Sequence, residues 1–117
     1  KDIIYGDGLL EKEFKRKRES LYNILKNKDF APPISLLHDI GYNKDLDDYL
    51  YKQVGYPVLN QITTFGSLFV GAYSTTSIRE YFAGGFEAYF MNEKQMVFDL
   101  CPVLHSKLKL LDDLEDQ

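Results

Sequence analysis

Apolar residues recur at intervals of three and four along most of this chain, the spacing that places side chains on one face of an α-helix. In residues 77–91 these positions form an aromatic stripe: Ile78, Tyr81, Phe82, Phe86, Tyr89 and Phe90. We expect this stripe to face a hydrophobic core. Ser77, followed three residues later by Glu80, matches a capping box and predicts the helix start. The pair Gly84–Gly85 weakens the middle of this helix, so we expect another element to pack closely there.

The same spacing predicts helices over most of the remaining chain: residues 9–28, 34–42, 43–54, 58–64, 92–100 and from 102 onward. Consecutive prolines at 32 and 33 separate the first two of these helices, because proline lacks the N–H donor and holds the backbone extended. Residues 1–5 are β-prone and precede a glycine-rich turn, so they are expected to form a short strand or a tail. The pattern predicts a mainly α domain with little or no sheet.

Charged residues cover the polar side of the predicted helix 9–28, with a basic run at positions 15–18. Glu11, Glu13 and Glu19 interleave with this run. A solvated helix face is the interpretation we favour, and binding of an acidic partner or a membrane surface is the alternative.

Length and composition narrow the function classes. A chain of 117 residues forms one domain with one modest core, and its net charge of −4 argues against nucleic acid as the main ligand. The longest weakly polar run, residues 65–73, is far shorter than the roughly 20 residues of a membrane span. Cys101 is the single cysteine, so no internal disulfide forms. We expect Cys101 to be a small buried residue at the start of a helix. The chain opens with Lys1 in place of Met, which suggests a fragment of a longer protein.

Tyr73, the run Glu80–Ala83 that begins seven residues later, and a helical tail with Pro102 resemble the catalytic domain of anthrax toxin lethal factor and its lethal-factor-like relatives. In that zinc metallopeptidase family, an H-E-x-x-H helix supplies two zinc-binding histidines and the catalytic glutamate. A later helix supplies a third, glutamate ligand, and a tyrosine seven residues before it supports the transition state. The resemblance is good over residues 73–110 and partial over 36–50. It implies a single zincin-like domain over 1–117, secretion, Glu80 as the third ligand and Tyr73 as the tyrosine.

The sequence departs from that family at the H-E-x-x-H motif, where it reads His38-Asp39-Ile40-Gly41-Tyr42. Asp39 stands in place of the catalytic glutamate, and Tyr42 stands in place of the second histidine. An aspartate would withdraw the base by about 1 Å, and such a displacement can cost on the order of 10²-fold in rate. Tyr42 would ligate as a phenolate, which a reference pKa of about 10 disfavours.

Two functions from different classes follow. The interpretation we favour is a binding or structural domain that keeps the lethal-factor-like scaffold but neither holds zinc nor hydrolyses peptides. Its partner would be a protein or peptide. The alternative is an active zinc metallopeptidase. In the alternative, His38, Glu80 and Tyr42 hold the metal, Asp39 is the base and Tyr73 donates to the oxyanion.

The binding interpretation carries an expectation for the surface. Exposed aromatic residues such as Tyr51 or Tyr56 should gather into an apolar patch, because monomeric proteins rarely leave a large apolar patch open without a function.

Overall fold

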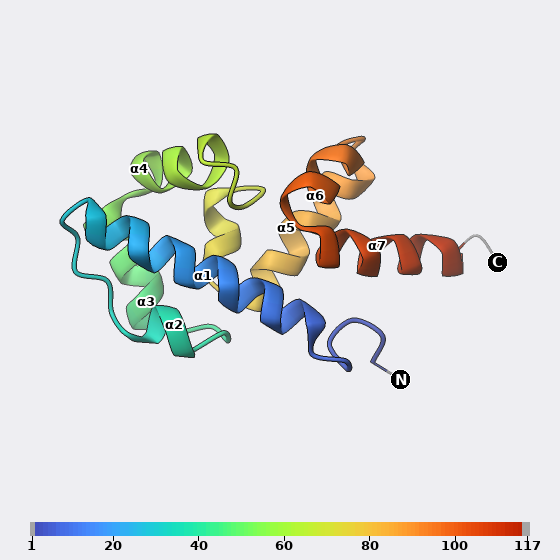
Figure 1. Cartoon of the computed structure of the whole chain (residues 1–117), viewed down its shortest axis with the longest axis horizontal. Helices are drawn as coiled ribbons and strands as arrows, with labels where there is room; N and C mark the ends of the chain where they lie inside the picture. The colour runs from blue at the N-terminus through green and yellow to red at the C-terminus, as the bar shows by residue number, and fades with distance from the viewer. Residues whose placement is uncertain (1, 116–117) are drawn as a thin grey trace.

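The long helix α1, Leu9–Asn27, runs through the middle of the molecule and contacts α2, α5 and α7 (Figure 1). The computed structural model describes residues 2–115, and every regular element in that range is helical, which confirms the prediction of a mainly α protein. The apolar stripe of α1 is fully buried at its two ends, by Leu10 and Phe14 near the start and by Leu21 and Leu25 near the end. Burial of this stripe joins the two groups of helices that lie on either side of α1.

The first group, green in Figure 1, lies beside the C-terminal half of α1. It consists of α2 (Ser35–His38), α3 (Lys44–Asp48) with its π-helical extension η1 (Tyr49–Val54), and α4 (Tyr56–Asn60) with its π-helical extension η2 (Gln61–Phe65). Asn43 caps α3, because its side-chain oxygen accepts a hydrogen bond from the Leu46 amide at 3.0 Å. Gly55 ends η1 in a left-handed conformation with φ of 85°, which glycine adopts without steric cost.

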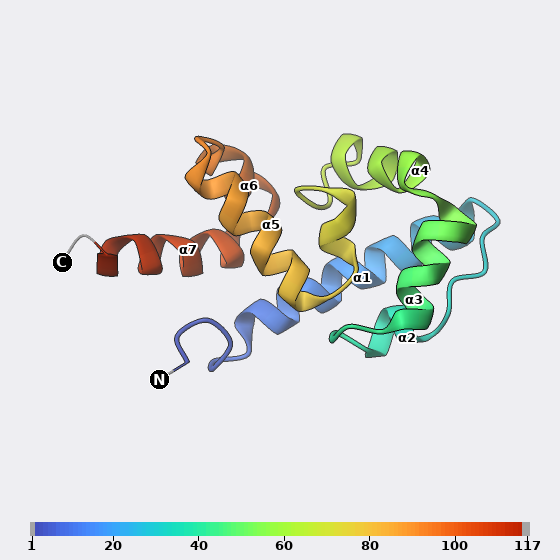
Figure 2. The same cartoon turned by 180° about the vertical axis from the view of Figure 1, so that it is seen from behind.

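The second group follows the irregular segment 66–71 and is yellow to red in Figure 2. It consists of the 3₁₀ helix η3 (Ala72–Thr75), α5 (Ile78–Phe90), α6 (Lys94–Leu100) and α7 (Pro102–Glu115). The Ser77 hydroxyl accepts from the Glu80 amide at 3.1 Å, which confirms the predicted cap of α5. Cys101 is buried directly before α7, as its position next to Pro102 predicted.

The glycine pair of α5 is a site of close packing, as predicted. A Cβ atom at Gly84 would collide with the Ser74 hydroxyl of η3, and one at Gly85 would collide with the Leu104 side chain of α7. The two glycines therefore let η3 and α7 approach α5 from different directions.

The aromatic stripe of α5 is only partly in the core. Tyr81 and Tyr89 are buried, whereas Phe86 and Phe90 are 44% and 42% exposed. The stripe is too wide for one helix face to bury, so the residues at its edge stack on one another, with ring centroids 4.8 Å apart for Phe86 and Phe90. The prediction that the whole stripe faces the core is therefore wrong at its outer edge.

Two local predictions also need correction. Residues 3–7 form turns in place of a strand, because the Asp2 carboxylate accepts hydrogen bonds from the Ile4 and Tyr5 amides at 3.1 and 2.9 Å. Lys1 lies outside the described residues. The predicted helix 34–42 is shortened to α2, because Asp39 after it is extended.

The polar side of α1 differs from the prediction at Arg18, which is 1% exposed. Its guanidinium lies 4.6 Å from the Phe14 ring centroid and donates to main-chain carbonyl oxygens at 2.7–3.0 Å. These acceptors are Leu36, Asp39, Thr75 and Thr76. Burial lowers the pKa of Arg18 to about 10, so the side chain stays protonated at neutral pH.

Glu13 is likewise buried, at 4% exposure. Its carboxylate accepts from the Tyr81 hydroxyl and the Val103 amide, both at 2.7 Å, and from the Leu104 amide at 3.2 Å. A side chain of α1 thus caps α7 from a distance. Lys15 and Arg16 are exposed, so the prediction of a solvated face holds for them and fails for Glu13 and Arg18.

Candidate functional site: a groove beside helix α5

The residues proposed for zinc chemistry at 38–42 are engaged locally or open to solvent. His38 is exposed at the end of α2. The Asp39 carboxylate accepts from the Asn43 side-chain amide at 2.9 Å. Tyr42 is 64% exposed and donates its hydroxyl proton to the Asp47 carboxylate at 3.3 Å.

The segment that contains these residues does lie beside the start of α5. The Ile78 amide donates to the Ile40 carbonyl oxygen at 2.7 Å, and Arg18 binds carbonyls from both segments. The contact is made by main-chain atoms. Across residues 2–115, no group of three or more His, Cys, Asp or Glu side chains is placed so that it could hold a metal ion.

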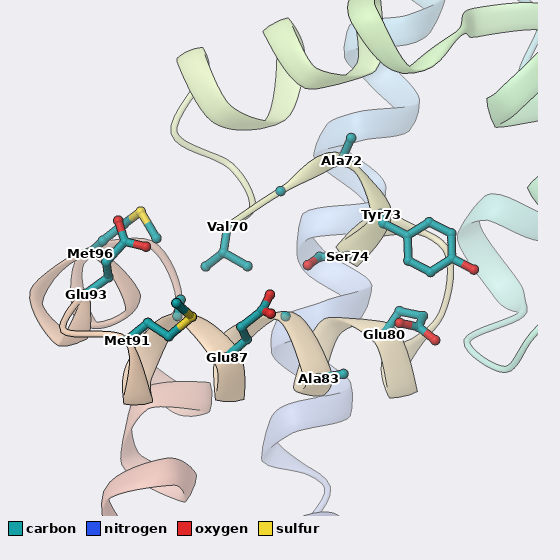
Figure 3. Close-up of a pocket in the computed structure, with 13 residues that line it drawn as sticks. Val70, Ala72, Tyr73, Ser74, Glu80, Ala83, Glu87, Met91, Glu93 and Met96 are labelled. Carbon is teal, nitrogen blue, oxygen red and sulfur yellow. The ribbon is translucent and has the colours of Figure 1, made fainter.

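Tyr73 and Glu80 line a groove of about 630 Å³ that we call the α5 groove, and none of residues 38–42 lines it. One wall is the segment 70–74 and the other is a face of α5. In Figure 3, Tyr73 and Glu80 stand at one end of this groove, and Met91, Glu93 and Met96 stand at the other. A volume of this size is typical of ligand-binding clefts.

The α5 groove is acidic. Glu80, Glu87 and Glu93 line it, and its lining includes no Lys, Arg or His within the part of the chain that the structure describes. The Glu87 carboxylate points across the groove toward Val70 and Ser74 (Figure 3). The walls between the carboxylates are apolar or small, so the groove combines negative charge with a surface that water wets poorly.

A row of tyrosines, two of them exposed and one half-buried, adjoins the groove. Tyr51, Tyr56 and Tyr73, the tyrosine row, have neighbouring ring centroids 5.5 and 6.2 Å apart. Tyr51 is 60% and Tyr73 50% exposed, whereas Tyr56, which the sequence suggested as exposed, is half-buried. A second hollow of about 380 Å³ lies between Tyr56 and Tyr73, so Tyr73 is a wall shared with the α5 groove.

Tyr56, the central residue of the tyrosine row, stays protonated and uncharged at neutral pH. Burial raises the pKa of Tyr56, and the nearby Asp47 carboxylate raises it further. A protonated phenol beside two other rings is both a hydrogen-bond donor and a stacking surface.

Cys101 is not a nucleophile in this arrangement. Burial raises the pKa of its thiol to about 11, so the thiolate is scarce at neutral pH. Burial also raises the pKa of Tyr81, which bonds to Glu13. This cluster is structural.

Sequence reasoning placed Tyr73 and Glu80 in a site and missed Ser74, Glu87 and the groove itself. A second periodic stripe on α5 was the available signal, because positions 80, 84, 87 and 91 recur at three and four and share one helix face. The stripe mixes charged, small and apolar residues, so hydrophobic periodicity alone does not detect it.

No helix within residues 2–115 has the length and apolar character needed to cross a membrane. Comparisons with protein-family models, with curated proteins and with solved structures gave no match to this chain.

Proposed function

We propose that this protein is a binding module that holds a segment of a partner protein along the tyrosine row and the adjoining α5 groove. The observation that carries the proposal is the contact of the exposed Tyr51 and Tyr73 rings with the half-buried Tyr56 ring, beside a groove of about 630 Å³. Tyrosines give a binding surface large contact area at low cost in conformational entropy, and they are enriched in protein interfaces. The resemblance to a lethal-factor-like scaffold with a degenerate zinc motif supports a role without hydrolysis.

Selection of binding peptides tests this function directly. A displayed library of random dodecapeptides is selected on the immobilised full chain, and the enriched peptides are measured by fluorescence anisotropy. We expect the Tyr51→Ser, Tyr73→Ser double variant to bind them about tenfold or more weakly, because central aromatic residues dominate interface energies. Tyr42→Ser is the matched control, since Tyr42 is also exposed but lies outside the tyrosine row. Equal binding by the double variant and the parent chain, or no enrichment at all, would contradict the proposal.

The alternative function is an active zinc metallopeptidase that uses His38, Glu80 and Tyr42. The main-chain bond from Ile78 to Ile40 is the observation in its favour, because it brings the two candidate segments together. Metal analysis separates the two functions. We expect far less than one equivalent of zinc in protein purified without chelator, whereas stoichiometric zinc that is lost on His38→Ala would favour the peptidase.

A further inference from the structure

The carboxylates of the α5 groove form no ion pair with any residue that the structure describes. Glu80 and Glu87 lie two turns apart on the same face of α5, and Glu93 lies at the far end of the groove. Among residues 2–115, the ion pairs join other acidic residues to lysines: Glu11, Asp7, Asp48, Asp112 and Asp113. The groove therefore presents negative charge that nothing within the described chain neutralises.

A buried hydroxyl faces the same space. Ser74 is 4% exposed and lines the groove, and its Oγ lies directly over Gly84. The neighbouring hydroxyls of Thr75 and Thr76 donate to main-chain carbonyls at 2.7 and 2.8 Å. No such bond is formed by the Ser74 hydroxyl within the described residues, and Figure 3 shows it directed into the groove.

Because the Ser74 hydroxyl opens into the groove and bonds to no other described residue, a ligand that enters the groove can supply its hydrogen bond. On the groove side of α5, Ala83 and Gly84 have side chains too small to fill the groove. A Cβ at Gly84 would displace the Ser74 hydroxyl. The hydroxyl and the Glu87 carboxylate thus lie on opposite walls of one open space.

We propose that the α5 groove receives a lysine or arginine side chain of the partner protein. The cationic head donates to the Glu80 or Glu87 carboxylate and to the Ser74 hydroxyl. Its aliphatic stem lies along Val70 and Met91. This inference rests on the proposed function, and it names the chemistry of the partner as a basic segment.

Three features favour a basic side chain over a free cation. A metal ion needs several ligands around one point, and no such group is present within residues 2–115. Lysine and arginine carry a long apolar stem, which suits walls made of Val70, Ala83 and Met91. The groove also shares Tyr73 with the hollow beside the tyrosine row, so residues that flank the cation can continue across both.

The test uses the full chain and four fluorescein-labelled nonapeptides. In the first, lysines alternate with prolines and tyrosines, and in the others arginine, norleucine or glutamate replaces every lysine. We expect the lysine and arginine peptides to bind, the norleucine peptide to bind about tenfold more weakly, and the glutamate peptide not to bind, because charge complementarity sets specificity. These comparisons need no protein variant, so they do not depend on the folding of one.

A charge-matched pair of variants locates the effect. Glu80→Gln with Glu87→Gln should weaken the lysine peptide about tenfold and reduce the salt dependence of binding, because screening acts on the removed charges. Glu19→Gln with Glu115→Gln removes the same charge from exposed positions outside the groove and should leave affinity unchanged. Ser74→Ala should weaken the lysine peptide with no change for the norleucine peptide.

The possible outcomes distinguish failure of this inference from failure of the proposed function. Equal binding of the lysine and norleucine peptides, with loss of both on Tyr73→Ser, would overturn the basic partner and leave the binding function standing. Equal weakening by both pairs of glutamine variants would show a general charge effect and would also overturn it. Absence of binding by every nonapeptide, with no enriched peptide in the display selection, would overturn both.

Discussion

The charged residues of α1 and those of the groove face of α5 have opposite roles, although both lie on helices that pack against the core. Glu13 and Arg18 of α1 are 4% and 1% exposed, and the structure surrounds each with main-chain partners. Glu80 and Glu87 of α5 line an open groove that contains no cation among its described lining residues. Charge on α1 organises the fold, and charge on α5 is available to a ligand.

The difference follows from what each side chain can reach. Arg18 meets carbonyls at the end of α2 and at the end of η3, where helices expose unsatisfied acceptors and partial negative charge. Glu13 meets the first free amides of α7, where the partial charge is positive. The glutamates of α5 face the segment 70–74, which approaches the glycine at 84, and the space between them stays open as a groove. A buried charge is therefore structural where helix ends converge on it.

The largest effect expected from this comparison is loss of the Arg18 guanidinium. Arg18→Met should lower the free energy of unfolding by about 3–5 kcal/mol, because it leaves several buried carbonyls without a donor. Urea unfolding followed by circular dichroism measures this change. Arg16→Met, which alters an exposed arginine of the same helix, should stay within about 0.5 kcal/mol of the parent. Equal effects of the two substitutions would show that the buried charge of Arg18 does not stabilise the fold, and the contrast between α1 and α5 would then be lost.

Removal of the Glu13 charge comes next. Glu13→Gln should cost about 1–3 kcal/mol, because one oxygen that accepts from α7 or Tyr81 becomes an amide donor. Amide hydrogen exchange should then accelerate at Val103 and Leu104, the residues that Glu13 caps. The control is Glu11→Gln, at an exposed ion pair with Lys15. Unchanged exchange at the start of α7 would contradict the remote cap.

The substitution Gly84→Ala tests how closely η3 packs on α5. Alanine normally stabilises a helix interior by about 1 kcal/mol over glycine. Gly84→Ala should instead lower stability by about 1–3 kcal/mol, because the new Cβ collides with the Ser74 hydroxyl. Ser74→Gly in the same chain should recover most of the loss. If Gly84→Ala stabilises the protein, η3 does not pack as closely on α5 as the structure indicates.

The ion pair between the exposed Asp7 and the buried Lys107 should give a small dependence of stability on pH. The hydrogen bond from Lys107 lowers the pKa of Asp7, and the Leu9 amide lowers it further. A carboxyl whose folded pKa is depressed contributes stability above its unfolded pKa of about 3.9, and that contribution is lost as the pH falls through the folded pKa. Asp7→Asn should therefore be less stable than the parent at pH near 7 and lose less on acidification. Parallel pH profiles of the two chains would contradict this.

The smallest effect on stability is expected for the carboxylates that line the open α5 groove. Glu80→Gln with Glu87→Gln should change the free energy of unfolding by no more than about 0.5 kcal/mol, because neither carboxylate bonds to another described residue. Thermal unfolding without peptide measures this. A loss of unfolding free energy as large as that of Glu13→Gln would show that these glutamates stabilise the fold, as the buried charges of α1 do.

Local structure was largely predictable from the sequence. The start of α5 at Ser77, the cap of α3 at Asn43 and the interruption at the prolines 32 and 33 follow from side chains that bond to, or constrain, their own backbone. Close packing at Gly84 and Gly85 was also foreseeable, because glycine in mid-helix loses stability without a compensating contact.

The candidate site was predictable only in part. Tyr73 and Glu80 were singled out from the sequence, and both line the α5 groove. The other residues proposed with them, His38, Asp39 and Tyr42, have side chains that are exposed or bonded locally. Spacing along a chain does not fix the direction of side chains on separate elements, so membership in one site required the tertiary structure.

The sequence by itself determined a mainly α protein, its principal helix boundaries and the faces that could be buried, because these depend on neighbours within a few residues. Only the tertiary structure decided that Arg18 and Glu13 are buried and that Phe86 and Phe90 remain at the surface. It also decided that the segment 70–74 lies across α5 to form a groove. Those outcomes depend on helix ends and glycines that are distant in sequence, and a side chain becomes structural or available according to what folding brings beside it.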